Sequence, residues 1–168
     1  MKTGTFLTGA LLPALLLSLQ VQAVTQPVVA YISFATPLTV TKGSDINFGW
    51  VLAAQPADYI ISPAGAVTAS RGGRILGGGG EGGSLLIAGS PDQTVDISIG
   101  NYMPDAGVVP SAATCSYGGA PSVPCRLVSQ AAPGAGRLLR VGATVSVDGS
   151  QKSGAHAAPS FDVIVNYH

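Results

Sequence analysis

The sequence has little charge of either sign. Only 10% of its 168 residues are Asp, Glu, Lys or Arg, against roughly 25% in an average globular domain, and 8 basic residues balance 8 acidic ones. Because there is no basic excess, we do not expect the chain to bind nucleic acid through its phosphates. The 46% of apolar residues exclude a disordered tail. The length fits one compact domain.

Helix-forming residues are also scarce. After residue 23 the chain has one Glu and two Lys, and Gly or Pro interrupts almost every stretch long enough for three helical turns. Short stretches of alternating apolar side chains occur instead, bounded by turn residues. This pattern predicts an all-β chain folded as an antiparallel immunoglobulin-like β-sandwich, with a small barrel as the second possibility. The expected strands are residues 28–40, 45–52, 58–62, 66–70, 84–88, 93–99, 112–116, 126–129, 137–147 and 161–167.

The first 23 residues contain the features of a secretory signal in the expected order. Lys2 precedes an apolar run from Phe6 to Leu19, and Val-Gln-Ala at 21–23 has the small-residue spacing of a cleavage site. The apolar run is shorter than the roughly 20 residues that a membrane-spanning helix needs. We therefore expect a cleaved signal peptide, residues 1–23, and a single exported domain, residues 24–168, with no membrane span in the mature chain.

The chain has two cysteines, Cys115 and Cys125. Both lie in the part expected to be exported, where oxidising conditions let disulfides persist. The Cys-x-x-Cys spacing of a reactive thiol pair is missing. The sequence therefore predicts a structural disulfide.

Residues for catalysis or metal binding are few. The histidines are His156 and His168, and neither a Gly-x-Ser-x-Gly nor a Ser-x-x-Lys motif occurs. No His pair has zinc spacing, and the Asp residues are scattered. We predict no catalytic, cofactor-binding or metal-binding residue, and a protein that is not an enzyme.

A glycine tract, residues 72–83, formally matches the dinucleotide-binding pattern Gly-x-Gly-x-x-Gly. That pattern needs a helix after it, whereas the next residues indicate a strand and a turn, so we interpret the tract as a mobile hairpin tip. Ser-Pro-Asp at 90–92 is expected to turn the strand at 84–88 into a hairpin with the strand at 93–99. Gly49 indicates a bulge or a close backbone approach. Trp50 is expected in the core rather than as a sugar-stacking surface.

Two groups of residues resemble a known family. They are Asp-Ile-Asn-Phe-Gly at 45–49 and, near the end, residues 139–147 followed by Gln151, Gly154 and Phe-Asp-Val-Ile-Val-Asn-Tyr at 161–167. The chain is similar to an uncharacterised family of exported bacterial proteins catalogued as a domain of unknown function. This resemblance implies a β-rich exported protein from a Gram-negative bacterium, and it assigns no catalytic residue.

The last strand is more loosely similar to that of chaperone-usher pilin subunits, which ends in alternating apolar residues and a penultimate aromatic. Its corresponding residues are Phe161, Val163, Val165 and Tyr167. Pilins also carry an extended N-terminal segment, as residues 24–41 are expected to be here. Their disulfide, however, usually joins early strands. The resemblance implies other copies or related subunits as partners, together with a periplasmic chaperone.

These observations favour an exported, non-enzymatic structural subunit of a surface fibre or extracellular layer, which passes through the periplasm to the cell surface. Subunits would assemble by β-strand addition, because an incomplete sandwich leaves an unpaired edge that another strand can complete. The inserted row would be Val28, Ala30, Ile32 and Phe34. The alternative is a monomeric secreted or periplasmic module that binds a ligand or glycan through its loops.

Overall fold

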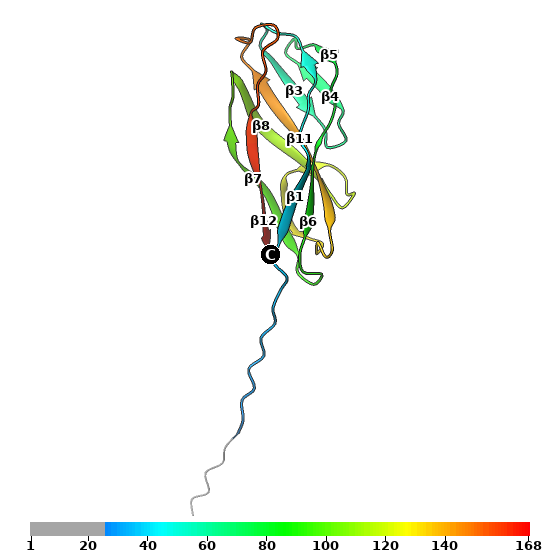
Figure 1. The fold of residues 1–168 in the computed structure, drawn as a ribbon, viewed down its shortest axis with the longest axis vertical. Coiled ribbons are helices and arrows are strands. Elements are labelled where there is room, and N and C mark those ends of the chain that lie inside the picture. Colours follow the sequence, from blue (N-terminus) through cyan, green and yellow to red (C-terminus); the bar gives the residue numbers. More distant parts are fainter. Residues whose placement is uncertain (1–25) are drawn as a thin grey trace, which may run out of the picture. The chain divides into compact units, whose positions relative to one another are not determined.

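The computed structural model describes residues 26–168, and within them the chain is all-β with antiparallel pairing, as the sequence predicted (Figure 1). The predicted signal peptide lies outside the described residues. These residues contain no helix long and apolar enough to cross a membrane. The chain divides into two units, Met1–Ser33 and Phe34–His168, and every strand belongs to the second. The strands are β1 (Thr39–Ser44), β2 (Trp50–Val51), β3 (Ala57–Ile61), β4 (Val67–Ser70), β5 (Ile75–Gly77), β6 (Gly83–Ala88), β7 (Val95–Met103), β8 (Val108–Tyr117), β9 (Val123–Pro124), β10 (Arg126–Gln130), β11 (Arg137–Val147) and β12 (Ser160–Tyr167).

The larger sheet has seven strands and is built around β11. One edge of β11 pairs first with β6 and then with β3, while its other edge pairs with β8 over nearly its whole length. β1 extends the sheet beyond β6, β4 beyond β3, and β9 beyond β8. Apolar residues alternate regularly along β11, and its odd-numbered side chains from Leu139 to Val147 are all buried. This buried face explains why β11 lies at the centre of the larger sheet.

The smaller sheet has three strands in the order β10-β7-β12, and β2 and β5 form a separate pair. Side chains from both main sheets meet in one core cluster, so these two sheets pack face to face. The buried members of this cluster include Ile87, Cys115, Tyr117, Leu139 and Val141 from the larger sheet and Val95, Ile97 and Leu127 from the smaller. A second cluster surrounds Tyr59 and contains Ala57, Val108, Val145 and Val147.

Several sequence predictions about individual strands are wrong. No strand covers residues 28–38, and the expected strand at 45–52 shortens to β2. The expected hairpin around residues 90–92 does not form, because β6 pairs with β1 and β11 whereas β7 pairs with β10 and β12. Both strands turn an apolar face to the same core, but from opposite sheets. Alternation alone does not distinguish this arrangement from a hairpin.

The glycine tract is also not a hairpin tip. It contains β5, which pairs with β2, and its last residue begins β6. A methyl group built on Gly79 would lie 2.0 Å from the backbone nitrogen of Gly49, so the two backbones touch where no side chain fits. The prediction of a close backbone approach at Gly49 is therefore correct.

Candidate functional site

A cleft opens between the larger sheet and β12. It has a volume of about 1640 Å³ and receives side chains from both main sheets. Its apolar lining includes Ile46, Phe48, Leu85, Val141, Val145, Phe161 and Val163. Phe161 and Val163 pack partly buried against the core. The cleft therefore continues the apolar interior of the domain to its surface.

The first half of β12, residues 160–164, lines this cleft, and one edge of the strand is unpaired among the described strands. Among the described strands β12 pairs with β7 alone, and the register opposes Tyr167 to Val95. The N–H of His168 donates to the carbonyl of Thr94 at 3.0 Å. Because hydrogen-bonded pairs alternate along an antiparallel ladder, the backbone groups of Val163, Val165 and Tyr167 face away from β7. These residues, which the sequence assigned to the terminal strand, thus combine core-facing side chains with an open hydrogen-bonding edge.

Tyr167 lies at the C-terminal end of this edge. Its hydroxyl accepts a hydrogen bond from the backbone N–H of Ser90 at 2.6 Å and donates one to the carbonyl of Thr36. Its ring packs partly buried against the core, as does Leu38. The phenol therefore ties the start of the domain and the β6–β7 turn to the last strand.

Residues 26–38 form no secondary structure. Within this segment the proposed assembly row is exposed: Val28 is 93% exposed, Ile32 77% and Phe34 86%, and Ala30 is also exposed. Tyr31, on the opposite row, is 92% exposed. Residues 28–36 contain neither charge nor proline, and Pro27 and Pro37 flank them. Such a segment pairs readily with a free strand edge.

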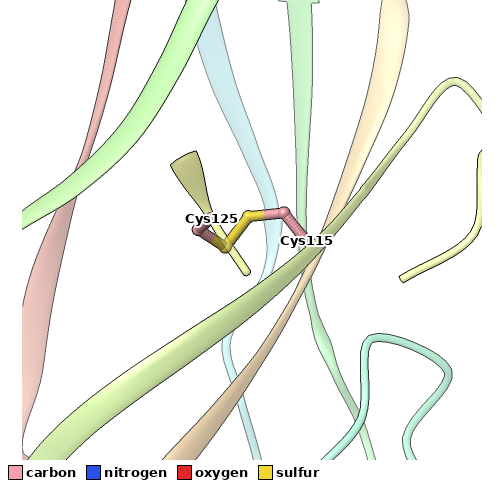
Figure 2. Close-up of a disulfide and its surroundings, with 2 residues drawn as sticks. All are labelled: Cys115 and Cys125. Atoms are coloured by element: carbon pink, nitrogen blue, oxygen red, sulfur yellow. A yellow bond between two sulfur atoms is a disulfide. The ribbon is translucent and has the colours of Figure 1, made fainter. Parts of the chain in front are cut away.

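The predicted disulfide between Cys115 and Cys125 is present (Figure 2). Cys115 lies on β8 and Cys125 directly follows β9, with their Cα atoms 5.0 Å apart. Both cysteines are buried in the main core cluster, so the disulfide is part of the hydrophobic core.

The two histidines lie far apart in different surroundings. Nδ1 of His168 lies 3.1 Å from Oδ1 of Asp96, which also accepts a hydrogen bond from the N–H of Ser129 at 2.8 Å. The Ser129 hydrogen bond is the main reason that the pKa of Asp96 lies below its usual value, and His168 lowers it further. His156 lies in the loop between β11 and β12, with its ring centroid 5.9 Å from that of Trp50. In residues 26–168 no three His, Cys, Asp or Glu side chains are grouped to hold a metal ion.

Trp50 is the site residue that the sequence analysis placed wrongly. Its side chain is 57% exposed and lines the cleft, so it is not a core residue. The glycine tract packs against it, since a methyl group on Gly78 would lie 2.8 Å from Cδ1 of the indole. The adjacent Gly49 was the only local sign of this unusual backbone.

One comparison with known proteins finds a family. The model for "Domain of unknown function (DUF4402)" matches residues 38–167, from just before β1 to the end of β12. The chain belongs to this family. No curated protein and no solved structure matches it.

Proposed function

We propose that this DUF4402 protein is an exported, non-enzymatic structural subunit that assembles into a surface fibre or extracellular layer by β-strand addition. The observation that carries the proposal is the free edge of β12 above an apolar cleft. An added strand would satisfy the unpaired backbone groups of β12 and cover the apolar side chains behind them in one step. On this view the two sheets form an incomplete immunoglobulin-like sandwich.

The size of the cleft favours a strand over a small ligand. Pockets for small molecules usually have volumes of about 300–1,000 Å³, and this cleft is larger. From Val163 to Tyr167 the free edge also contains no Pro or Lys, the residues that commonly block unwanted pairing. The edge is thus suited to accept a strand.

The proposed donor is the segment around residues 28–34 of a second copy. Its uncharged side chains alternate as a strand requires, and they are exposed in a single chain. With Val28, Ala30, Ile32 and Phe34 turned into the cleft, the donor would bury this apolar row and leave Val29 and Tyr31 outside. Burying each of the large side chains in this row would contribute about 1.5–3 kcal/mol.

The direct test is the oligomeric state of the purified protein, measured by size-exclusion chromatography with light scattering. The wild-type chain should form concentration-dependent oligomers, and Ile32→Asp should abolish them because a carboxylate would enter the apolar cleft. Tyr31→Asp is the matched control. It adds the same charge one residue away, on the opposite row, and should assemble as the wild type does.

A peptide experiment covers the case in which assembly needs a chaperone. A synthetic peptide of residues 26–37 should raise the melting temperature of the Ile32→Asp protein, whose own segment no longer inserts. At a peptide concentration 100 times Kd the stabilisation would be about 2.7 kcal/mol. The same peptide with Ile32→Asp should have no effect. Strand addition would be refuted, and the alternative of a monomeric ligand-binding module favoured, if the wild-type protein stays monomeric and neither peptide changes the melting temperature of the Ile32→Asp protein.

A further inference from the structure

The chain is fastened to its own domain directly after the proposed donor row. The row ends at Phe34, and the carbonyl of Thr36 accepts a hydrogen bond from the hydroxyl of Tyr167. Leu38 packs against the core of the same domain. Only Ala35 lies between the last donor residue and this attachment, so the Cα atoms of Phe34 and Thr36 are at most about 7 Å apart. A copy that donates its row therefore brings its domain into contact with the accepting copy.

The surface around this attachment is uncharged. A methyl group built on Gly89 would lie 2.9 Å from Cδ2 of Leu38 and 3.3 Å from Cγ of Pro133, so these residues lie together. We call this surface the base, and it consists of residues 36–38, 89–91 and 133. Asp92 and His168 are the ionisable residues that directly follow parts of it in the chain. The base therefore suits an apolar partner surface.

Exposed apolar side chains also lie at the other end of the domain. β5 is located away from the C-terminus, and β2 pairs with it (Figure 1). Trp50 of β2 and Leu76 of β5, which is 60% exposed, both line the cleft. Residues 153–159, in the loop before β12, line it as well, and the ring centroid of His156 lies 5.9 Å from that of Trp50. We call Trp50, Leu76 and residues 153–159 the tip.

The charged residues that line the cleft are two Lys and two Asp, so their charges cancel. Lys42 and Asp45 form an exposed ion pair at 3.0 Å. The carboxylate of Asp162 accepts a hydrogen bond from Nδ2 of Asn101 at 2.7 Å. Lys152 precedes the loop residues of the tip. An uncharged donor row followed by an uncharged base therefore meets no net charge along the cleft.

The cleft is open toward the tip and ends before the base. Its lining follows β12 from Ser160 to Ile164, whereas Tyr167 lies beyond it and holds the acceptor's own Thr36. A donor domain at the Tyr167 end would collide with the acceptor's base and with the segment that leaves there. With Phe34 of the donor at the Ser160 end, its domain lies against the tip instead. The donor strand then runs antiparallel to β12.

We infer that each added copy places the base of its domain on the tip of the accepting copy, where Trp50 and Leu76 become buried between the two domains. This inference rests on the proposed strand addition. It adds a contact between folded domains and a direction for the inserted strand. Because a single residue links the strand to its domain, consecutive domains have little freedom to move against each other.

The first test compares assembly with peptide binding. Pro91→Asp places a carboxylate on the base, where the tip would desolvate it, and should weaken oligomerisation by at least about tenfold in light scattering over a concentration series. The peptide of residues 26–37 carries no domain. Its Kd for the Ile32→Asp protein, measured by calorimetry, should therefore not change when Pro91→Asp is added. Pro121→Asp is the matched control, because Pro121 is exposed in the loop between β8 and β9, outside base, tip and cleft.

Trp50 supplies the second test, because it is the only tryptophan of the chain. Its fluorescence emission should move to shorter wavelengths when the wild-type chain assembles, since the indole leaves water. Binding of the peptide alone to the Ile32→Asp protein should shift the emission less. Circular dichroism of each variant checks that the fold is intact, and the emission test requires no change to base or tip.

The outcomes separate this inference from strand addition. If Pro91→Asp assembles as the wild type does, or weakens peptide binding as much as assembly, the base has no contact of its own. If the emission of Trp50 stays unchanged on assembly, or the peptide alone shifts it equally, no second domain covers the tip. A wild-type chain that stays monomeric while the peptide binds also contradicts the contact. In each of these cases strand addition survives, whereas the absence of both oligomers and peptide binding would refute both proposals.

Discussion

The hydroxyl of Tyr167 donates a hydrogen bond to the backbone carbonyl of Thr36, 131 positions earlier in the chain. The same oxygen accepts the N–H of Ser90, a residue that is 7% exposed. One phenol therefore fixes where the N-terminal segment leaves the domain and how the chain crosses from β6 to β7.

Tyr167→Phe keeps the ring and removes both hydrogen bonds. Because the N–H of Ser90 then loses its acceptor in a buried position, we expect the free energy of unfolding to fall by about 1–2 kcal/mol without a change of fold. Urea denaturation measures this difference. Tyr102→Phe is the control, since the Tyr102 side chain is 39% exposed and should tolerate the change within about 0.5 kcal/mol. Equal stability of the two variants would mean that the Tyr167 hydroxyl has no structural role.

The buried disulfide should raise the free energy of unfolding, because it restricts the conformations of the unfolded chain. Cys115 and Cys125 are separated by 10 positions, and a loop of this length gives an entropic stabilisation of about 2.7 kcal/mol. We expect the variant with both cysteines changed to Ala to be less stable by that amount or slightly more, because it also loses buried sulfur atoms. Denaturation of this variant, compared with the wild type with and without reductant, separates the two contributions. An unchanged midpoint in both reduced and variant protein would contradict the prediction.

The hydrogen bonds of Asp96 predict a pH dependence. The N–H of Ser129, which has a left-handed backbone with φ of 50°, and the ring of His168 together hold the pKa of Asp96 below its usual value. A lowered folded pKa adds stability above the unfolded pKa, about 3.9, and this stability is lost as the pH falls through the folded pKa. Asp96→Asn should therefore lose less stability than the wild type between neutral pH and pH values below about 4.

Urea denaturation at a series of pH values tests this expectation. Asp92→Asn is a suitable control, because Asp92 is exposed in the turn before β7 and its substitution removes the same charge. If Asp96→Asn and the wild type lose stability in parallel as the solution is acidified, the environment of Asp96 has no energetic effect.

Local alternation was sufficient to predict the strongest strands. β11 matches its expected boundaries and β12 is within one residue of them, since each repeats apolar side chains on one face without a break. The all-β class and the disulfide followed from equally local features, the scarcity of helix formers and the presence of two cysteines in the part of the chain that the sequence predicts to be exported. The sequence could not predict which sheet each strand joins, because the alternation in residues 84–88 and 93–99 fits one sheet as well as two.

The candidate site was only half predictable. The sequence indicated the terminal strand and the exposed apolar segment, but the cleft between the larger sheet and β12 is built from Leu85, Val141 and Phe161, which are distant in the chain. Trp50 was misplaced for a related reason. Its exposure depends on the glycine tract, which folds back against β2 some 28 positions later, as the pairing of Trp50 with Gly77 and the contact with Gly78 show. Nothing in the apolar run around Trp50 encodes that contact.

Gly79→Ala tests this arrangement most directly. A methyl group at Gly79 would lie 2.0 Å from the nitrogen and 2.1 Å from the Cα of Gly49, and a backbone cannot yield as a flexible side chain does. The β2–β5 pair must then separate, and Trp50 loses its support, so its fluorescence emission should shift toward that of a free indole in water. We expect a cost of about 1–3 kcal/mol, the usual range for forcing extra atoms into a packed site. Gly134→Ala is the control, because a methyl group there meets nothing within 4 Å and only the φ of 54° opposes it. This control should lower stability by less and leave the emission of Trp50 unchanged, whereas an unaltered emission in Gly79→Ala would show that the two backbones do not touch in solution.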